Sequence, residues 1–257
     1  MNRLNSALPE LLALQGFGTR QMCRMAVERG EVSIRYSADD EIPWTIITDP
    51  DHRPEIEGLF LCYGKWTLPC LQNLHLIFFK PGNVECSRQP TNHKSVLDFF
   101  PEPFIRRGLQ PVGRLDADAT GLLLLSDEGN FNHAVTSPRR RLPKTYRIGM
   151  ESPLTDEQKL TLETGVLLHD DPKRTVPCQV EIVSNMAADI TITEGRYHQV
   201  KRMLAAVGNR VASIHRSAIG DLTLGNLSAG EWRYLTPEEV QVLITRPAKV
   251  ITNSRTL

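Results

Sequence analysis

The chain of 257 residues has no long apolar run. A transmembrane helix needs roughly 20 apolar residues in succession, whereas Gly121 and the four leucines after it make a run of only five. The first residues include Pro9 and Glu10, where a secretory signal peptide needs an unbroken apolar segment. We therefore expect neither a membrane span nor a signal peptide, and we expect a cytoplasmic location.

Cysteine is scarce. The five cysteines are odd in number and none belongs to a C-x-x-C pair. Disulfide frameworks use even numbers of cysteines, and zinc ribbons use paired ones. The cysteine pattern thus excludes both classes, and we expect no metal site.

The chain also lacks net charge, since 30 Lys and Arg residues balance 30 Asp and Glu residues. Two segments are nevertheless basic and free of acids, residues 137–147 (SPRRRLPKTYR) and residues 196–216. Such a cluster is either an ordinary solvated face or a stripe that binds a polyanion. Tyr146 and Tyr197 lie within these segments, and RNA bases stack on aromatic rings, so RNA is favoured.

The length suggests one large domain or two modest ones. Residues 8–15 read as a short helix, and a second helix is expected between Thr19 as N-cap and Gly30 as the residue that stops it. Strands are expected near 31–35 and 58–62. We predict a small α/β module over residues 1–70.

The remainder, residues 74–250, is expected to form one domain. Short strands are indicated at 74–79, 121–125, 145–149, 179–183 and 190–193. Capping boxes at Thr155 with Gln158 and at Thr236 with Glu239 begin two helices, and a third is expected over 198–207. This order predicts an α+β fold with a mixed, mainly antiparallel sheet and flanking helices.

The segment with the most chemistry is PVGRLDADATGLLLLSDEG, residues 111–129. A calcium loop is one interpretation of Asp116 and Asp118, but Leu124 and Asp127 stand where an EF-hand needs a polar ligand and a bidentate Glu. A two-metal nuclease is another, with further carboxylates from Asp127, Glu128 and Glu194.

The third interpretation is a single catalytic Asp116 with Arg114 beside it and Asp118 as a turn former. In a fourth interpretation, Asp116 and Asp118 only form hydrogen bonds within the turn and have no catalytic role.

The same segment resembles the central motif of the pseudouridine synthases. HLIFFKPGNVECS resembles the family's opening strand and Lys-Pro turn, SPRRRLPKTYRI its Lys-x-Tyr motif, and EGRYHQVKRMLAAVGNRVASIHRSAIGDLTL its third motif. Together these segments cover residues 74–240, and the EGRYHQVKRM form most resembles the RsuA-like branch that acts on small-subunit ribosomal RNA. The front module, with Thr19-Arg20 and Gly30-Glu-Val-Ser-Ile34, is similar to the RNA-binding module named after ribosomal protein S-four. It departs from that pattern at Thr19 and Asn5 and in the acidic stretch 39–41.

The resemblance implies isomerisation of uridine to pseudouridine without metal or organic cofactor. It implies that Asp116 is the nucleophile, attacking either the uracil ring or the ribose anomeric carbon, and that Tyr146 stacks on the flipped base. It assigns Lys201 as the basic partner of Asp116 and Arg114 as the contact to the flipped nucleotide or its phosphate. His198 and Gln199 are interpreted as helix-capping residues, and Met203 and Leu204 as core.

Contacts to the RNA backbone are expected from eight basic residues: Arg20, Arg24, Arg139, Arg140, Arg141, Lys144, Arg196 and Arg202. The expected partner is ribosomal RNA or an assembling subunit, and the expected oligomeric state is a monomer. A large-subunit RNA pseudouridine synthase and a non-catalytic RNA-binding assembly factor on the same fold remain as alternatives.

Overall fold

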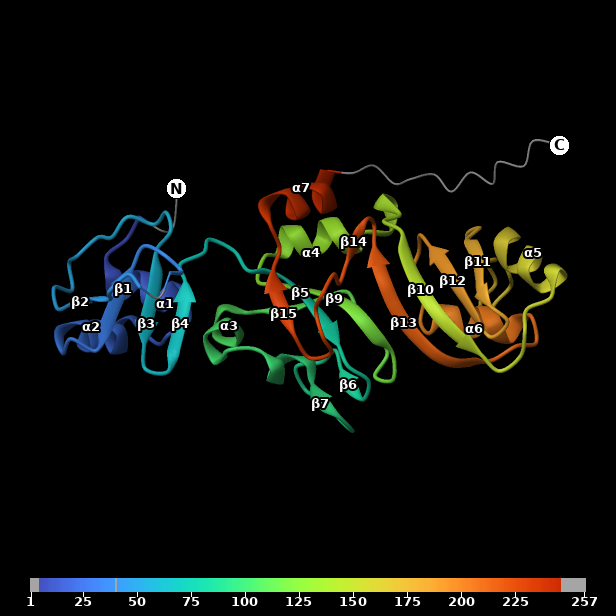
Figure 1. Cartoon of the computed structure of the whole chain (residues 1–257), viewed down its shortest axis with the longest axis horizontal. Coiled ribbons are helices and arrows are strands. Elements are labelled where there is room, and N and C mark those ends of the chain that lie inside the picture. Colours follow the sequence, from blue (N-terminus) through green and yellow to red (C-terminus); the bar gives the residue numbers. More distant parts are fainter. Residues whose placement is uncertain (1–4, 40, 246–257) are drawn as a thin grey trace. The chain divides into compact units, whose positions relative to one another are not determined.

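The computed structural model describes residues 5–39 and 41–245 (Figure 1). By its internal contacts the chain divides into a smaller unit, Met1–Leu74 with Leu97–Gln110, and a larger unit, His75–Val96 with Pro111–Leu257. Segment 97–110 lies within the range predicted for the second domain, but its contacts are with the smaller unit. No helix in the described parts of the chain combines the length and apolar character that a bilayer crossing needs.

The smaller unit consists of short helices and one antiparallel sheet. The helices are α1 (Leu8–Leu14), α2 (Arg20–Glu28) and α3 (Glu102–Arg107), and the 3-10 turn η1 spans Val96–Phe99. The sheet has the order β2 (Thr45–Ile47), β1 (Val32–Arg35), β3 (Phe60–Tyr63), β4 (Trp66–Pro69). The Thr19 hydroxyl accepts from the Met22 backbone N–H, which confirms the predicted N-cap. Strands β2 and β4 were not predicted.

Side-chain hydrogen bonds explain why segment 97–110 belongs to the smaller unit. The Arg107 guanidinium donates to the carbonyls of Leu71 and Gln72 at 3.0 and 3.1 Å. The Gln15 amide donates to the same Leu71 carbonyl at 3.0 Å. These bonds join α3 to both α1 and the end of the strand region.

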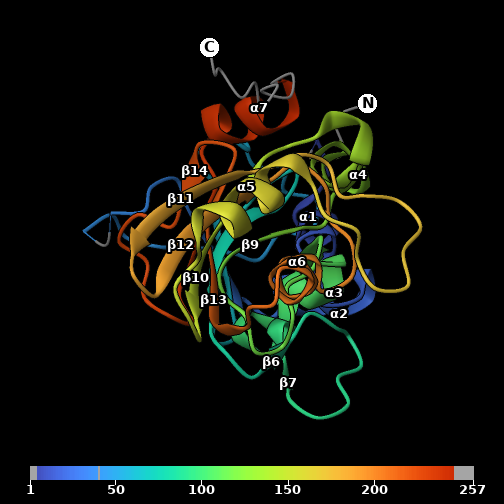
Figure 2. The ribbon, with the colours of Figure 1, turned by 90° about the vertical axis from the view of Figure 1, so that its right-hand side faces the viewer.

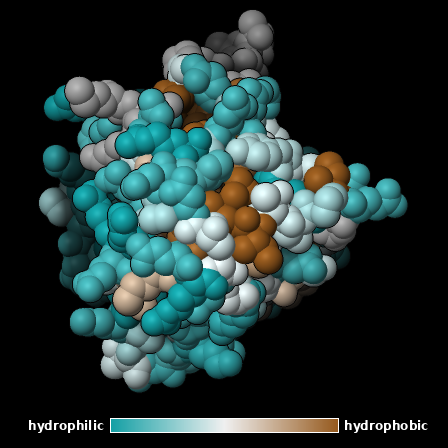
Figure 3. Space-filling view, turned by 90° about the vertical axis from the view of Figure 1, so that its left-hand side faces the viewer, coloured by the Kyte–Doolittle hydropathy of each residue, from teal (hydrophilic) through white to brown (hydrophobic). Residues whose placement is uncertain are grey.

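One face of the smaller unit carries an apolar patch amid polar surface (Figure 3). The unit exposes several large apolar or aromatic side chains: Met22, Met25, Tyr36, Ile42 and Ile46. Ile46 is 63% exposed. The inner face of α2 is instead formed by the buried Cys23, Ala26 and Val27.

A sheet of nine strands forms the larger unit, with the order β11 (Gln179–Ser184), β12 (Ala187–Ile192), β10 (Lys144–Met150), β13 (Val211–Ile219), β9 (Thr120–Ser126), β5 (His75–Lys80), β15 (Trp232–Tyr234). β14 (Leu222–Thr223) pairs with β13, and β8 (Gln110–Val112) pairs with β9. Every neighbouring pair along the main order is antiparallel except β13 and β9, which are parallel. The predicted mainly antiparallel α+β fold is confirmed. A separate parallel pair joins β6 (Val84–Glu85) and β7 (Lys94–Ser95).

Helices of the larger unit are α4 (Gly129–Thr136), α5 (Asp156–Thr164), α6 (Gln199–Ala206) and α7 (Pro237–Thr245), and η2 (Pro138–Arg140) is a 3-10 turn. Both predicted capping boxes are present, with reciprocal bonds at Thr155 with Gln158 and at Thr236 with Glu239. Figure 2 shows α6 on one side of strands β10 and β13.

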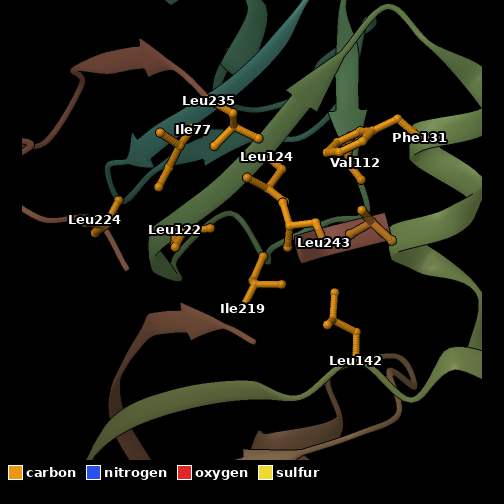
Figure 4. Packing of buried hydrophobic residues seen from close by; sticks show 11 residues of the cluster. Ile77, Val112, Leu122, Leu124, Phe131, Leu142, Ile219, Leu224, Leu235 and Leu243 are labelled. Atoms are coloured by element: carbon orange, nitrogen blue, oxygen red, sulfur yellow. The ribbon is translucent and has the colours of Figure 1, made fainter. Parts of the chain in front are cut away.

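The core of the larger unit lies between the sheet and helices α4 and α7. Ile77 of β5 and Leu122 and Leu124 of β9 meet Phe131 of α4 and Leu243 of α7, all at most 2% exposed (Figure 4). Strand β9 is buried along nearly its whole length, as its apolar run predicted. It therefore gives the loop before it a rigid anchor.

Candidate active site

A cavity of about 1000 Å³ opens in the larger unit beside this anchored loop. Its walls come from the loop before β9, from β10 and β13, and from the segment that leads into α6. The four residues predicted to be catalytic all line it: Arg114, Asp116, Tyr146 and Lys201. The fold thus brings together side chains that lie up to 87 positions apart (114 to 201) in the sequence.

Asp116 lies in the turn that leads into β9. Its backbone carbonyl accepts from the Ala119 N–H at 3.2 Å, and its side chain is 26% exposed at the cavity. At the start of the strand, Gly121 has a φ of +109°, and a Cβ there would lie 2.3 Å from the Arg216 carbonyl oxygen. Only glycine allows β9 and β13 to approach this closely.

Lys201 bridges the two aspartates of the loop. Its ammonium donates to both Asp118 carboxylate oxygens at 2.7 and 2.8 Å and lies 3.2 Å from Oδ2 of Asp116. These hydrogen bonds lower the pKa of the Asp118 carboxyl. Burial alone would lower the pKa of Lys201, but hydrogen bonds to Asp118 and the charge of Asp116 outweigh burial and raise it. Lys201 therefore stays a cation beside both carboxylates.

His198 is the second side chain at Asp116, with Nε2 3.4 Å from Oδ1 of that carboxylate. The residue stands at the N-cap of α6 in a left-handed conformation, φ 47° and ψ 35°, and its side chain makes no capping bond. The capping role predicted for His198 is wrong, because its imidazole turns toward the loop instead. Gln199 does not cap α6 either, because its side-chain oxygen accepts from the N–H of Arg196, which precedes the helix, at 2.8 Å. Met203 and Leu204 are fully buried, as predicted.

Lys80 at the end of β5 holds the aspartate loop from behind. Its side chain is completely buried and donates to the carbonyls of Pro81, Ala117 and Ala119 at 3.0, 3.0 and 2.7 Å. Burial lowers the pKa of this ammonium, and nearby Cys86, Asp118 and Asp116 partly oppose that effect. Lys80 fixes the backbone on which Asp116 stands.

Tyr146 and Lys144 project from β10 on the cavity side, two residues apart and so on one face of the strand. Arg216 of β13 is the direct cross-strand partner of Tyr146. It is 3% exposed and its Nε donates to the Leu122 carbonyl at 2.7 Å, while its Nη2 finds no hydrogen-bond partner within the described residues. Burial, and secondarily the charge of Arg216, lowers the pKa of Lys144 to about 8. Two basic residues therefore flank Tyr146, Lys144 on its own strand and Arg216 on β13.

The two metal-based interpretations of the aspartate pair have little support in this geometry. Asp116 and Asp118 share a lysine ammonium, and Asp127 lies beyond the far end of β9. Within residues 5–39 and 41–245 no group of three or more His, Cys, Asp or Glu side chains is arranged to hold a metal ion.

The eight basic residues predicted to contact RNA occupy different environments. Arg20 and Arg24 on α2 pair with Glu10 and Glu28 at 2.8 and 3.0 Å on an exposed surface of the smaller unit. In the larger unit, Arg139 and Arg141 are exposed at η2, and Lys144 is in the cavity. The guanidinium of Arg140 bonds to the Ile244 carbonyl, and that of Arg202 to the carbonyls of Tyr197 and His169.

Arg196 has a structural environment. Its guanidinium pairs with Asp171 and Glu194 at 2.9 and 3.1 Å and also donates to the Lys173 and Arg174 carbonyls. Residues 196–216 contain no acid, but the charge of Arg196 is neutralised by these two carboxylates from outside that segment. Arg196 thus braces the segment leading into α6 instead of presenting a free charge to RNA.

Sequence reasoning did not assign roles to Lys80, His198 and Arg216 at the site. One signal was available for Lys80, a charged residue that closes an otherwise apolar strand. Alternation along residues 211–219 would have placed Arg216 on an inward face. No sequence pattern showed that His198 would adopt a left-handed backbone and reach Asp116.

Comparison with known proteins agrees with this arrangement. Residues 74–206 match the family described as RNA pseudouridylate synthase. The chain is 46% identical over 162 residues to the ribosomal small subunit pseudouridine synthase A of Salmonella typhimurium, covering 63% of this chain and 70% of that protein. It is 44% identical over 166 residues to the Escherichia coli protein of the same name, covering 64% and 71%. A crystal structure of a pseudouridylate synthase superposes with a TM-score of 0.65 at 31% identity, covering 93% of this chain and all of the other.

The sheet and its carboxylate-bearing cavity thus define an enzyme of the isomerase type that modifies RNA. The chain belongs to the RNA pseudouridylate synthase family, in its RsuA-like branch.

Proposed function

We propose that this protein isomerises one uridine of small-subunit ribosomal RNA to pseudouridine, with Asp116 as nucleophile. The observation that carries the proposal is the position of the Asp116 carboxylate at the cavity, 3.2 Å from Lys201, with the buried Tyr146 lining the same cavity. The relatives named for small-subunit RNA support this substrate.

The reaction requires only rearrangement within the nucleotide. The bond between N1 of uracil and C1′ of ribose breaks, a bond between C5 and C1′ forms, C5 loses its proton and N1 gains one. Asp116 forms a covalent intermediate at either the ring or C1′ and leaves again, a task suited to a carboxylate. The uridine must first leave its stack, at a cost of a few kcal/mol, which the cavity and the Tyr146 ring help to offset.

Lys201 orients the Asp116 carboxylate in this mechanism, because its ammonium lies 3.2 Å from Oδ2 of that residue. Arg114, exposed at the cavity edge, contacts the flipped nucleotide or its phosphate. The chemistry needs no metal or organic cofactor.

The smaller unit is proposed to bind RNA in the manner of the module named after ribosomal protein S-four. Support comes from its two N-terminal helices on an antiparallel sheet and from Arg20 and Arg24 along one helix. The exposed Arg139 and Arg141 would contact phosphates and supply affinity without base choice. The cytoplasmic location and the monomeric state stay predictions.

Tritium release tests the substrate. Small-subunit and large-subunit ribosomal RNA transcripts, labelled at C5 of uracil, are incubated with the wild-type protein, because the label is lost when C5 bonds to C1′. Release from the small-subunit transcript alone is expected. Release from the large-subunit transcript alone would support the alternative target, and binding to either RNA without release would indicate a non-catalytic RNA-binding factor. Assembly-intermediate particles are assayed in parallel.

A further inference from the structure

The segment that leads into α6 presents an aromatic ring to solvent at the cavity. Tyr197 is 75% exposed, although it lines the same cavity as Asp116. Its ring stacks on the His198 imidazole, with centroids 3.8 Å apart and planes 19° from parallel. His198 in turn contacts Asp116. One face of the Tyr197 ring is therefore covered by an imidazole, while the residue as a whole remains largely exposed.

The backbone that carries these rings is held firmly. Arg196 is fixed by the carboxylates of Asp171 and Glu194, and the Gln199 amide donates to the same Glu194 at 2.8 Å. Arg202 donates to the Tyr197 carbonyl at 3.3 Å. The left-handed conformation of His198 is uncommon for a residue with a Cβ and persists only where surrounding bonds enforce it. The exposed ring is thus presented by a preorganised segment.

A flat ring exposed beside a cavity of about 1000 Å³ matches one ligand chemistry in particular. When a uridine leaves its stack, the adjacent base loses a stacking partner, and an aromatic side chain can replace it. Tyr197 lies next to the residue that touches Asp116, so a base stacked on it would be a close neighbour of the nucleotide at the nucleophile.

We propose that the Tyr197–His198 stack is a binding site for the nucleobase adjacent to the target uridine, so that this base becomes the third layer of the stack. The inference rests on the proposed function. The stack would be a second nucleotide subsite. Its binding energy is available only when the target uridine has left the RNA stack.

The test uses a small-subunit RNA fragment that contains the modified uridine, with 2-aminopurine at its 5′ or 3′ neighbour. Stacking on an aromatic ring quenches this fluorophore, so the wild type should quench one of the two positions. Tyr197→Ala should abolish the quenching, while Tyr197→Phe should retain it. Because Tyr197 is so exposed, neither change should disturb folding. Met186→Ala, an exposed apolar change outside the cavity lining, is the matched control.

Turnover gives the second readout. Removing the ring should lower the rate at limiting enzyme by about 5- to 100-fold, the size expected for one base–aromatic stack. An abasic nucleotide at the neighbouring position should reduce wild-type turnover similarly and make the Tyr197→Ala change nearly without effect. Equal quenching and equal turnover in Tyr197→Ala and wild type would overturn the subsite alone. Wild-type protein that makes no pseudouridine in the fragment or in full ribosomal RNA would instead overturn the proposed function, and the subsite with it.

Discussion

The surroundings of the basic residues on helix α2 of the smaller unit differ from those of Lys80, Lys144 and Arg216 in the larger unit. Arg20 and Arg24 of the smaller unit pair with carboxylates on an exposed surface. In the larger unit Lys80 and Arg216 are buried and Lys144 is partly buried, and among the described residues none of these three forms a salt bridge. The basic residues of α2 and the three buried or partly buried ones of the larger unit therefore have different roles.

An exposed cation can exchange its carboxylate partner for another anion, whereas a buried cation keeps its partners. An exposed ion pair contributes about 0–1 kcal/mol, so phosphate groups can replace its acid at little cost. A buried cation without a carboxylate is expensive, and such groups concentrate at functional sites. Here Lys144 and Arg216 flank Tyr146, and Lys80 holds the Asp116 loop. Four tests can break or sharpen this comparison.

Among the changes to basic residues, the largest effect is expected at Lys80. Lys80→Met would leave three loop carbonyls without their shared donor, and each unsatisfied buried group costs about 1–3 kcal/mol. We expect the free energy of unfolding to fall by about 3 kcal/mol or more in urea titrations. Turnover of the folded fraction should fall by about 100-fold, because the Asp116 loop shifts. Arg24→Met, with its exposed pair, should lose no more than about 1 kcal/mol, and equal losses at both positions would contradict the comparison.

Lys201 should rank next. Lys201→Met leaves Asp116 and Asp118 as neighbouring carboxylates without their common cation. Single-turnover rates are expected to fall by about 100-fold with little change in stability. Lys201→Arg retains the charge and should recover most of the rate. If Lys201→Met kept the wild-type rate, the cation would have no part in the reaction.

The lowered pKa of Lys144 should make the stability of the protein depend on pH. Its pKa is lowered by burial to about 8 from 10.5, so between these values the unfolded chain binds more protons than the folded one. Stability of the wild type relative to Lys144→Met should therefore rise as the pH increases from about 8 toward 10.5, and stay level below that window. Urea unfolding of both proteins across this range measures the difference. A constant difference at all pH values would mean that Lys144 titrates normally.

The smallest effect belongs to the exposed pairs. The double change Arg20→Gln with Arg24→Gln should weaken RNA affinity by a few fold and lower the slope of log K against log salt by about 1–2. Turnover at saturating RNA should not change. A loss of turnover at saturation would show that these residues act beyond affinity.

Much of this fold was readable in the sequence because its signals are local. Thr19, Thr155 with Gln158, and Thr236 with Glu239 specify helix starts through side chains that bond nearby backbone. The apolar run after Gly121 predicted a strand buried on both faces. Strand β2 escaped detection because three residues between turn-rich acidic segments carry too little pattern to identify.

The site was readable only in part, for a physical reason. Asp116, Tyr146 and Lys201 sit in motifs, and the structure brings them to one cavity. The Lys201 bond to Asp118, the reach of Lys80 to three carbonyls and the His198 contact depend on tertiary packing between distant segments. No local sequence pattern indicates that the Arg196 guanidinium pairs with the carboxylates of Asp171 and Glu194.

The most direct test compares the two aspartates of the loop by substituting each with asparagine, which preserves shape and removes charge. Single-turnover tritium release from small-subunit ribosomal RNA is measured for both variants, with circular dichroism and RNA binding as controls for folding.

Asp116→Asn is expected to lose release by about 10⁴-fold or more, as for removal of a nucleophile. Asp118→Asn gives up an exposed ion pair and should lose no more than about 5-fold. Substantial release by Asp116→Asn, or equal losses in the two variants, would contradict the assignment of Asp116 as the nucleophile.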